Sequence, residues 1–416
     1  MIYRYLGKPG AEAARNTFYR TYRFRIEKVT RRDYTEQNMV KVVKMENSST
    51  STNRVSTERW IYLDVAKIIS IFLIVLLHVT AGAWGELQIG SFSWYVATFF
   101  NGLSRFGFPL FFMQIGALFL NPEREMTIKK LYSKYILRLV TAFLFWSVIG
   151  MLIRYWQELP GGFSEFTLGG FISGVLSGAS AVHWFIFVAI SMYLIIPILR
   201  AIAKSPTACR YFLILWFVFT FAVPLLRQMS YFFPSMPDGF HVVLGQILGV
   251  ADQVTPQMVL QYSGYLLLGH YIHVTKFSRN ASTRFAWIFL VGLVSTIGFT
   301  ILFSMRDGVS SETFFGPFTV TVLAMAAGFM GSAKYLLEKT WFKDSLYKFI
   351  RFFSSAAFGI FLVHDVLRLQ LVRLGLHTTA FPPILSIPVL TIVVFVASAF
   401  IAYFLKKIPK VGKYIV

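Results

Sequence analysis

The sequence predicts an all-α fold: a polytopic membrane helix bundle of about ten transmembrane helices, with both termini cytoplasmic. Of its 416 residues, 56% are hydrophobic and only 14% are charged, and the mean hydropathy is +0.60. Soluble globular domains carry about a quarter charged residues. Long apolar runs recur along the chain, and basic residues gather in every second connection between them. Together these observations indicate an integral membrane protein.

Composition divides the chain into three parts. Residues 1–58 are basic and rich in Arg, Ser and Thr, with no apolar run that resembles a signal peptide, and they predict a disordered cytoplasmic tail. Met39 and Met45 are alternative translation starts, either of which would shorten this tail. Residues 59–405 hold the apolar runs and predict one membrane domain, and residues 406–416 predict a basic cytoplasmic C-terminal tail.

Ten apolar runs are long enough to cross a bilayer as helices, which takes about 17 to 25 residues. The second and third overrun the bilayer at their ends. The ninth is interrupted by His364, Asp365 and Arg368. The expected spans lie near 61–83, 94–120, 132–156, 183–201, 211–229, 257–273, 284–304, 315–337, 351–372 and 383–405.

The positions of the basic residues predict the orientation. With the N-terminus inside, 33 of the 40 Lys and Arg residues fall in inner segments. This is the positive-inside bias, and a missed span would invert it downstream. The net charge of +21 therefore reflects orientation and attraction to anionic lipid head groups, so nucleic acid is not an expected partner. The inner segments are 1–60, 121–138, 200–210, 274–284, 334–351 and 406–416.

Two longer connections fall on the predicted outer side. Residues 157–182 are rich in Gly and Ser, and part of this segment is expected to lie as a short helix in the membrane interface. Residues 230–256 form the longest expected outer loop. Such loops are where a substrate from outside the cytoplasm would be admitted.

Cysteine and histidine usage gives no sign of a metal or disulfide framework. The single cysteine, Cys209, excludes an internal disulfide and is expected to be a buried, small apolar residue. His270 and His273 lie about one helical turn apart but have no evident third ligand. No metal site is therefore expected.

Ionisable residues deep in a span mark candidate functional sites, because each costs about 2.5 to 3.5 kcal/mol on insertion scales. The first span contains KIISIFLIVLLH, in which Lys67 and His78 share one helix face about 16 Å apart along the axis. Asp64 lies near the same face. Lys67 is explained equally well as a long side chain that snorkels to the inner head groups, with Asp64 as its salt-bridge partner. The alternative for His78 is a hydrogen bond between helices.

Two further spans carry buried charge. Arg105 lies near the middle of the second span, and Pro109 has no N–H for the carbonyl of residue 105, which predicts a kink and a free acceptor there. A guanidinium suits phosphate or carboxylate, and the alternative is an intramembrane ion pair without an obvious partner. In the ninth span, His364 and Asp365 fit equally a polar cluster facing a cavity and a hydrogen bond between helices.

The order of these segments resembles the acyltransferase family 3 membrane proteins, over essentially all of 59–405. The chain looks closest to members without an appended domain, such as the O-acetyltransferases of the enterobacterial common antigen type. Only eleven residues follow the last span. The resemblance is carried by RWIYLDVAKIISIFLIVLLHV, RFGFPLFFMQIGALF, SKYILRLVTAFLFWS, HWFIFVAISMYLIIPILR, GYLLLGHYI and FGIFLVHDVL.

The family's signature residues can be placed on this sequence. Its first-span signature, a basic residue, ten residues and then His, matches Lys67 and His78. Of the Arg-x-x-Arg pair that the family tends to show before the third span, only the second position matches, because Tyr135 precedes Arg138, with Lys134 adjacent. The remaining matches are Arg105, Pro109, Phe111, Phe112 and Gly116 in the second span, Trp184 and Phe185 in a WF motif, and His364 in the ninth span.

The resemblance implies an O-acetyltransferase of the bacterial plasma membrane. Such an enzyme moves an acyl group, usually acetyl from cytoplasmic acetyl-CoA, to a hydroxyl of a cell-surface glycan or glycolipid, with no permanently bound cofactor. His78 is then the catalytic residue, either as general base or as transient acyl carrier. Lys67, at the inner end, suits the phosphates of CoA. The candidate donor- and substrate-binding residues are Lys67, Arg105, Asp64, Arg138, Trp184 and His364.

A transporter or flippase for a glycolipid or a small anion is the alternative function. Intramembrane Lys, Arg and His residues also mark transport paths. Transport predicts paired polar positions in two similar halves, and this sequence does not show them. The identity of the acceptor, the acyl chain length and the oligomeric state are left open by the sequence.

Overall fold

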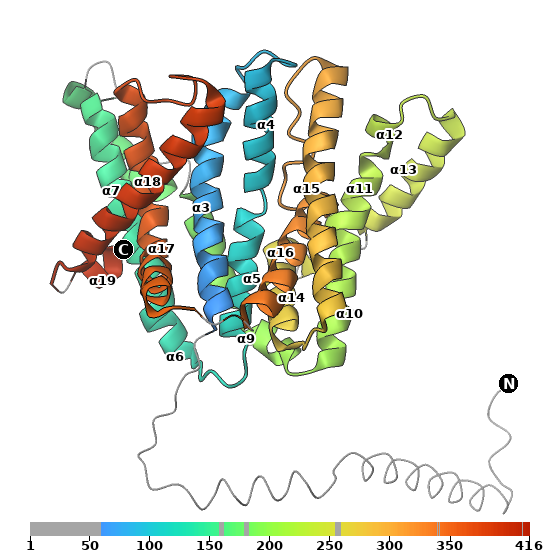
Figure 1. Cartoon of the computed structure of the whole chain (residues 1–416), viewed down its shortest axis with the longest axis horizontal. Helices are drawn as coiled ribbons and strands as arrows, with labels where there is room; N and C mark the ends of the chain where they lie inside the picture. Colours follow the sequence, from blue (N-terminus) through green and yellow to red (C-terminus); the bar gives the residue numbers. More distant parts are fainter. Residues whose placement is uncertain are drawn as a thin grey trace, which may run out of the picture. The chain divides into compact units, whose positions relative to one another are not determined.

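Helix α3, Ile61–Trp84, is the element around which several others gather (Figure 1). It has few polar residues, so it is apolar on most of its surface and can pack against helices on several sides. Ile71 and Ile74 are fully buried. Its neighbours are α4 (Phe92–Ser104), α5 (Gly107–Phe119), α16 (Val320–Glu338), α17 (Asp344–Arg373) and α18 (Pro383–Lys406).

The structure is a computed structural model and describes residues 60–157, 162–178, 183–253, 259–338, 340, 342–409 and 411–416. The predicted N-terminal tail, 1–58, and the alternative starts within it lie outside these residues. Regular structure in the described residues is helical throughout, without a strand, which confirms the predicted all-α class. Cys209 is buried, as expected.

Nine helical stretches in the described part of the chain are long and apolar enough to cross a membrane. They confirm a polytopic helical membrane protein and coincide with the expected spans, apart from the sixth. Some stretches join two or more helices across a break or a π-helical turn. They are α3; α4 with α5; α6 (Ile128–Lys130), a π-helical turn (Leu131–Ile136) and α7 (Leu137–Gln157); α9 (Trp184–Ala203); α10 (Pro206–Phe217), a π-helical turn (Val218–Ala222), α11 (Val223–Arg227) and α12 (Met229–Phe232); α15 (Arg279–Asp307); α16; α17; and α18.

The second stretch is interrupted in its middle, at Arg105. Helix α4 ends one residue before Arg105, and α5 begins two residues after it. Pro109 lies in the first turn of α5, where its missing N–H cannot bond to the Arg105 carbonyl. Gly107 sits against α3, since a Cβ at this position would lie 2.9 Å from the Cβ of Leu73. The predicted kink is therefore present, and it lies against the middle of α3.

The expected sixth span, 257–273, is described as a shorter buried helix, α14 (Tyr262–Val274). Its 13 residues are about 20 Å long, less than the hydrocarbon thickness of about 30 Å. Just before it, the indole of Trp216 donates to the carbonyl oxygen of Gln261 at 2.7 Å. Such bonds satisfy backbone groups where water is absent. At its other end, the ammonium of the buried Lys334 donates to the carbonyl oxygens of Ile272, His273 and Thr275.

Helices α5 and α14 cross with their backbones in near contact. A Cβ added at Gly116 would lie 1.8 Å from the carbonyl oxygen of Leu266, and one at Gly269 would lie 1.9 Å from the carbonyl oxygen of Met113. Each helix thus presents a glycine to the backbone of the other. Small residues allow this approach in membrane bundles, where van der Waals packing drives the association of helices.

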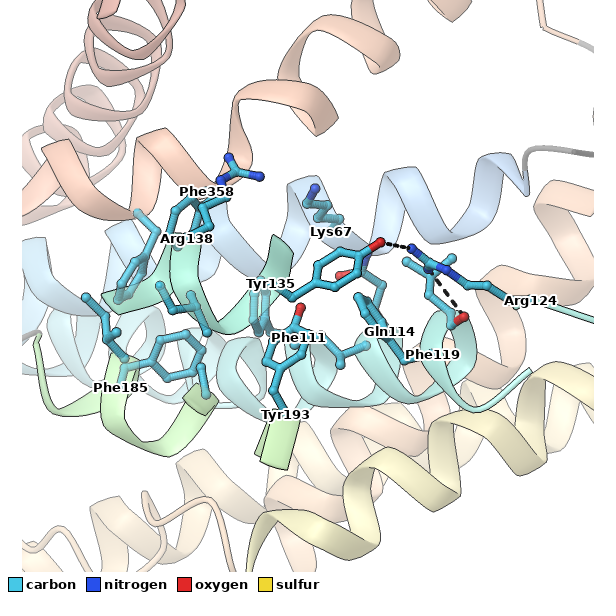
Figure 2. A pocket seen from close by; sticks show the side chains of 16 residues that line it. Lys67, Phe111, Gln114, Phe119, Arg124, Tyr135, Arg138, Phe185, Tyr193 and Phe358 are labelled. Carbon is cyan, nitrogen blue, oxygen red and sulfur yellow. Dashed lines mark hydrogen bonds between the residues drawn. The ribbon is translucent and has the colours of Figure 1, made fainter. Parts of the chain in front are cut away.

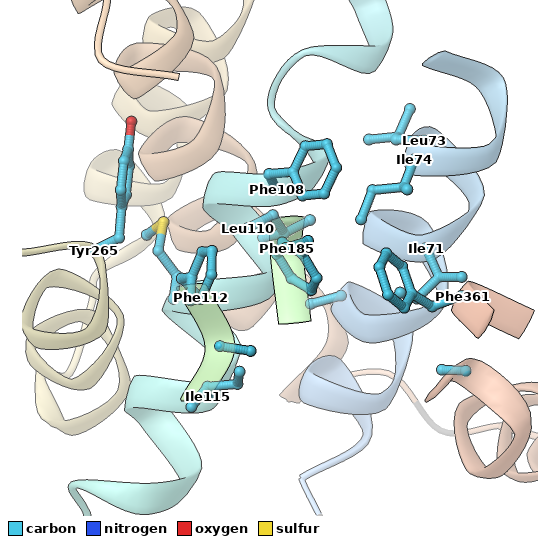
Figure 3. Close-up of a cluster of buried hydrophobic side chains, with 14 of the residues drawn as sticks. Ile71, Leu73, Ile74, Phe108, Leu110, Phe112, Ile115, Phe185, Tyr265 and Phe361 are labelled. Carbon is cyan, nitrogen blue, oxygen red and sulfur yellow. The ribbon is translucent and has the colours of Figure 1, made fainter. Parts of the chain in front are cut away.

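Aromatic and branched side chains fill the space between α3, α5, α9 and α17 (Figure 3). Phe185 of α9 is at the centre, with its ring centroid 5.2 Å from that of Phe112 and 4.9 Å from that of Phe361. Ile71 and Ile74 of α3 complete this part of the core. The packed rings fix the relative positions of the four helices that surround the candidate site.

The two connections that were expected on the outer side both contain helix. Residues Leu168–Ser177 form the expected short helix, α8, after a 3₁₀ turn at Gly162–Glu165. Within 230–256, however, the chain forms the 16-residue helix α13, Asp238–Gln253, so the expectation of a loop is wrong there. The apolar residues of DGFHVVLGQILGVADQ recur with helical spacing after an acidic first turn, which favours a helix.

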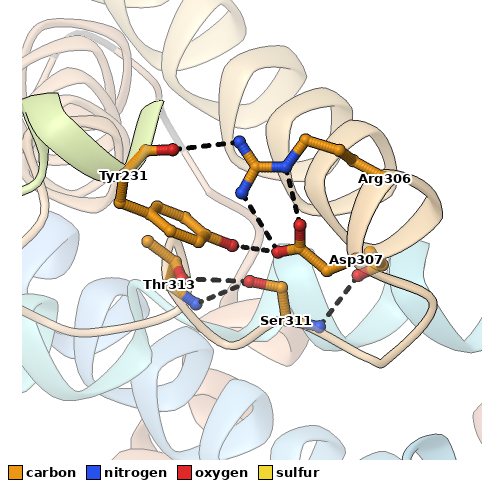
Figure 4. A network of polar contacts seen from close by, with 6 residues as sticks. Tyr231, Arg306, Asp307, Ser311 and Thr313 are labelled. Atoms are coloured by element: carbon orange, nitrogen blue, oxygen red, sulfur yellow. Dashed lines mark hydrogen bonds and ion pairs between the residues drawn. The ribbon is translucent and has the colours of Figure 1, made fainter. Parts of the chain in front are cut away.

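A polar network links the start of this connection to the end of α15 (Figure 4). The guanidinium of Arg306 pairs with the carboxylate of Asp307 at 2.6 Å and also donates to the carbonyl oxygen of Tyr231 at 3.0 Å. The Tyr231 hydroxyl donates to the same carboxylate. These contacts tie α12 to α15 beside α13.

The last residues of the chain fold back onto α7. They form the short helix α19, Gly412–Ile415, and Val416 is buried. The indole of Trp146 donates to the carbonyl oxygen of Ile415 at 2.8 Å, and the guanidinium of Arg138 donates to that of Val416 at 2.6 Å. This part of the predicted C-terminal tail is therefore packed against the membrane domain.

Candidate active site

His78 of α3 and His364 of α17 bring two imidazole rings together inside the bundle. Their ring centroids are 5.3 Å apart, with an angle of 42° between the planes. His364 is fully buried, and its Nδ1 lies 2.6 Å from the carbonyl oxygen of Phe361 on its own helix. A carbonyl only accepts, so Nδ1 carries the proton, and Nε2 of a neutral His364 ring is an acceptor.

Both rings keep a nitrogen without a partner. Among the described residues, neither His78 Nε2 nor His364 Nε2 has a hydrogen-bond partner, although both atoms are buried. Buried polar atoms are satisfied in the great majority of cases, and exceptions concentrate where a site performs chemistry. The hydrogen bond of His364 Nδ1 lies within α17, and the two rings meet across helices by packing.

Asp365, next to His364, is paired within its own helix. Its carboxylate accepts from the guanidinium of Arg368 at 2.7 and 3.0 Å, and Asp365 is buried. A carboxylate neutralised by an arginine therefore lies one residue after His364. The polar residues of the ninth span thus include an ion pair, Asp365 with Arg368, directly after His364 on α17.

Arg105 lies at the break between α4 and α5. Its guanidinium donates to the side-chain oxygen of Asn101 at 2.6 Å and lies over the ring of Phe315, 4.2 Å from its centroid. Arg105 Nε is buried and has no hydrogen-bond partner in the described part of the chain. An amide and an aromatic face thus hold this cation, and one of its N–H groups is left for another acceptor.

A cavity of about 230 Å³ lies near the beginning of α3, and we call it the cationic cavity (Figure 2). Lys67 and Arg138 line it, as does Arg124, which belongs to the connection between α5 and α6. No acidic residue is among the described residues that line it. The remaining lining residues are Phe111, Gln114, Ile115, Leu118, Phe119, Tyr135, Leu139, Phe185, Ile186, Ala189, Tyr193, Phe358 and Phe361.

Arg138 reaches this cavity from the first turn of α7. Besides its bond to Val416, its guanidinium lies 4.8 Å from the centroid of the Phe358 ring. Arg138 Nε is buried without a hydrogen-bond partner in the described residues. Gln114 of α5 resembles it, because its side-chain oxygen is also buried and without such a partner.

A second cavity, of about 340 Å³, lies near the other end of α3. It is bordered by the last turns of α3, by the end of α17 and by α18. Charged and hydroxyl groups are mixed with aliphatic side chains on its wall. Its lining residues are Val79, Gly82, Ala83, Glu86, Arg368, Leu371, Val372, Leu376, His377, Thr378, Thr379, Leu390 and Val394.

The imidazole pair lies between the linings of these two cavities. Along α3, Lys67 lines the cationic cavity and Val79, the residue after His78, lines the second one. Along α17, Phe361 lines the cationic cavity, and Arg368 lines the second one. His364 falls between these two residues on the same helix. The imidazole pair therefore lies between residues of the two linings on both α3 and α17.

Five of the seven residues expected at the site line neither cavity, namely His78, His364 and Arg105, described above, and Asp64 and Trp184. Asp64 accepts a hydrogen bond from the hydroxyl of Ser354 on α17 at 2.5 Å and is not part of either lining. Trp184 is partly exposed at the start of α9, against the ring of Phe108 at 5.4 Å. Its neighbour in the WF motif, Phe185, does line the cationic cavity.

Sequence reasoning missed three polar residues of the cationic cavity. Arg124 was counted only as a charge that sets orientation, since it lies in a connection. Gln114 gave a readable signal, because an amide inside an apolar span is uncommon. Tyr193 gave none, because a tyrosine in a span is an ordinary residue.

Fold and site together define a polytopic membrane protein whose polar site lies among its transmembrane helices. Residues 60–403 match the acyltransferase domain that defines acyltransferase family 3. The chain belongs to this family and is a membrane acyltransferase, which confirms the resemblance at the level of the family. No curated protein and no solved structure matches the chain.

Proposed function

We propose that the protein is an O-acetyltransferase that takes an acyl group, most simply acetyl, from cytoplasmic acyl-CoA. It transfers this group to a hydroxyl of a cell-surface glycan or glycolipid. The observation that carries the proposal is the position of His78 and His364 between two cavities at opposite ends of α3. A donor and an acceptor from opposite sides of a membrane need such an arrangement in order to react.

The donor occupies the cationic cavity. Lys67 and Arg138 offer positive charge to phosphate, and the lining has no acidic residue among those described. The basic residues of 121–138 support a cytoplasmic position for this end, by the positive-inside rule. The acyl thioester then extends past Phe185 and Phe361 toward the imidazole pair.

His78 acts as the general base. The acceptor hydroxyl attacks the thioester carbonyl carbon while the imidazole of His78 takes its proton. The C–S bond breaks, the electron pair goes to the sulfur of CoA, and the imidazolium returns the proton to this leaving group. His364 orients the His78 ring. Arg105, at the break between α4 and α5, stabilises the negative charge that develops on the thioester carbonyl oxygen.

The acceptor reaches the histidines through the second cavity. Its wall offers Arg368, His377 and the hydroxyl groups of two threonines, which suit a polar molecule with several hydroxyls. The membrane is the bacterial plasma membrane. Among known members, the enterobacterial common antigen type, without an appended domain, is the proposed relative.

Transfer of label across a sealed vesicle tests the proposal. Proteoliposomes with the protein in one orientation receive labelled acetyl-CoA on the cytoplasmic side, and a panel of glycans and glycolipids is enclosed on the other. We expect label on an acceptor with wild-type protein and a loss of about 10²- to 10⁴-fold with His78→Ala. His241→Ala, in α13 and outside both cavities, serves as the matched control.

Two results would contradict the proposal. Undiminished transfer by His78→Ala would remove the assigned role of this residue. Absence of transfer to every acceptor, together with passage of an acceptor lipid or a small anion across the membrane, would favour transport instead.

A further inference from the structure

The cationic cavity has a third cation that the signature residues do not include. Resting on the function proposed above, we propose that Arg124 binds the phosphate groups of the CoA donor, and that it replaces a guanidinium which Tyr135 cannot supply. Tyr135 and Arg138 are three residues apart at the start of the third span, and only Arg138 is basic. Arg124, eleven residues before Tyr135, lines the same cavity.

The contacts of Arg124 bring its guanidinium to the side chain at position 135. It donates to the Tyr135 hydroxyl at 2.8 Å, and Figure 2 shows the dashed line that joins the two groups. It also lies over the ring of Phe119, 4.3 Å from the centroid. A cation therefore stands beside the place where an arginine at position 135 would project.

The backbone of Arg124 is held as firmly as its side chain. Arg200 of α9 donates to the carbonyl oxygen of Arg124 at 2.9 Å, and its other nitrogen donates to those of Phe119 and Asn121. The end of α5 and the following turn are thus bound to α9. An arginine fixed in this way loses little freedom when it binds an anion, so more of the interaction appears as affinity.

The charge of the cavity selects a donor with several negative charges. Lys67, Arg124 and Arg138 contribute three positive charges, and the described lining residues contribute no negative one. Figure 2 shows Lys67 between Arg138 on one side and the Arg124–Tyr135 pair on the other. A CoA thioester carries its phosphates at one end and its neutral acyl group at the other, so the phosphates fit the cations and the acyl group faces the histidines.

Aromatic rings beside Arg124 suit the adenine of the same donor. The rings of Tyr135 and Tyr193 are nearly parallel, 13° apart in orientation and 6.0 Å between centroids, and Phe119 lies edge-on to Tyr135. Purine bases stack on such faces, and an arginine beside the stack adds a cation for the phosphate. The nucleotide end of CoA would therefore lie next to Arg124.

Steady-state transfer with two donors tests this role. Purified full-length protein in nanodiscs is assayed with acetyl-CoA and with S-acetylpantetheine, which has the thioester but no phosphate. For Arg124→Gln we expect KM for acetyl-CoA to rise about tenfold or more with kcat within about twofold, and kcat/KM for S-acetylpantetheine to be unchanged. Arg124→Lys keeps the charge without the guanidinium fork, so its KM for acetyl-CoA should lie between those of wild type and Arg124→Gln.

Relocating the cation provides a second measurement that does not depend on one variant folding well. The double variant Arg124→Gln with Tyr135→Arg should regain most of the affinity for acetyl-CoA, because the guanidinium returns to the same cavity. Isothermal titration with CoA and with adenosine 3′,5′-bisphosphate measures this directly. Tyr135→Phe, which keeps the ring, should weaken CoA binding less than Arg124→Gln does.

The outcomes separate this inference from the proposed function. Equal CoA affinity in wild type and Arg124→Gln would overturn the role of Arg124 and leave the donor assignment standing. An equal loss of kcat/KM with both donors, without rescue by Tyr135→Arg, would mean that Arg124 only supports the fold. Wild-type protein that binds no CoA would overturn the donor assignment and the role of Arg124 together.

Discussion

His78 and His364 face each other from two helices that are far apart in sequence, with 5.3 Å between their ring centroids. The Nδ1 of His364 is engaged by the carbonyl of Phe361, so the ring is fixed while His78 Nε2 is left without a hydrogen-bond partner in the described residues. One ring is thus held by its helix, and the other is available for proton transfer.

The first prediction concerns His364. Because it packs on His78 and is fixed by its own helix, we expect it to position the base. His364→Asn should lower kcat by less than the factor of about 10² to 10⁴ that a general base contributes, with KM for the donor unchanged. Initial rates over a range of acetyl-CoA concentrations give both constants. A raised KM with unchanged kcat would instead place His364 in donor binding.

The second prediction concerns the order of the chemical steps. If His78 is a general base, no acetylated enzyme forms, so rapid mixing with acetyl-CoA in the absence of acceptor should release no burst of CoA. A burst equal to the enzyme concentration, with acetyl found on His78 by mass spectrometry, would show instead that the imidazole carries the acyl group.

The third prediction concerns the crossing of α5 and α14. Gly116→Ala and Gly269→Ala would each place a methyl group within 2 Å of a carbonyl oxygen of the facing helix. We expect each to destabilise the protein by about 1 to 3 kcal/mol, because two backbones must move apart. Unfolding in detergent by heat or denaturant measures this.

The matched control for that crossing is Gly298→Ala in α15, a helical position with nothing within 4 Å of the added methyl. It should leave stability unchanged or raise it by up to about 1 kcal/mol, since alanine is the better helix former. Equal effects at all three glycines would refute the close approach of α5 and α14.

The fourth prediction concerns the end of α14. Lys334→Met would leave three carbonyl oxygens at this buried helix end without their donor. We expect a loss of about 1 to 3 kcal/mol in the free energy of unfolding. Lys348→Met, at an exposed position on α17, should change it by less than about 0.5 kcal/mol. If both variants are equally stable, the bonds from Lys334 to the end of α14 contribute nothing to the free energy of unfolding.

Much of the fold could be predicted because the membrane imposes it. Apolar runs of sufficient length must form helices, since a span has to bond its own backbone groups. The break at Arg105 was also readable, because Pro109 removes a specific donor. Helix α14 was harder to anticipate. Its residues are as apolar as those of a span, and only its neighbours reveal that it is short and enclosed.

The candidate site was predictable only where one helix carried it. Lys67 and His78 share a face of α3, so their spacing alone placed them on one stripe. The contact between His78 and His364 and the contact between Arg124 and Tyr135 depend on how the helices meet. Trp184 and Asp64 show the converse, since a sequence match does not say which way a side chain points.

The docking of residues 412–416 on α7 has a consequence for biosynthesis. Ribosomes make a chain from its N-terminus, so α3 and α7 are already in the membrane long before Val416 leaves the ribosome. The bond from Arg138 to Val416 can therefore form only after α18, the last of the long helices in the described residues, has been synthesised. One wall of the cationic cavity, at Arg138, would therefore be completed only after the helices that line this cavity have been made.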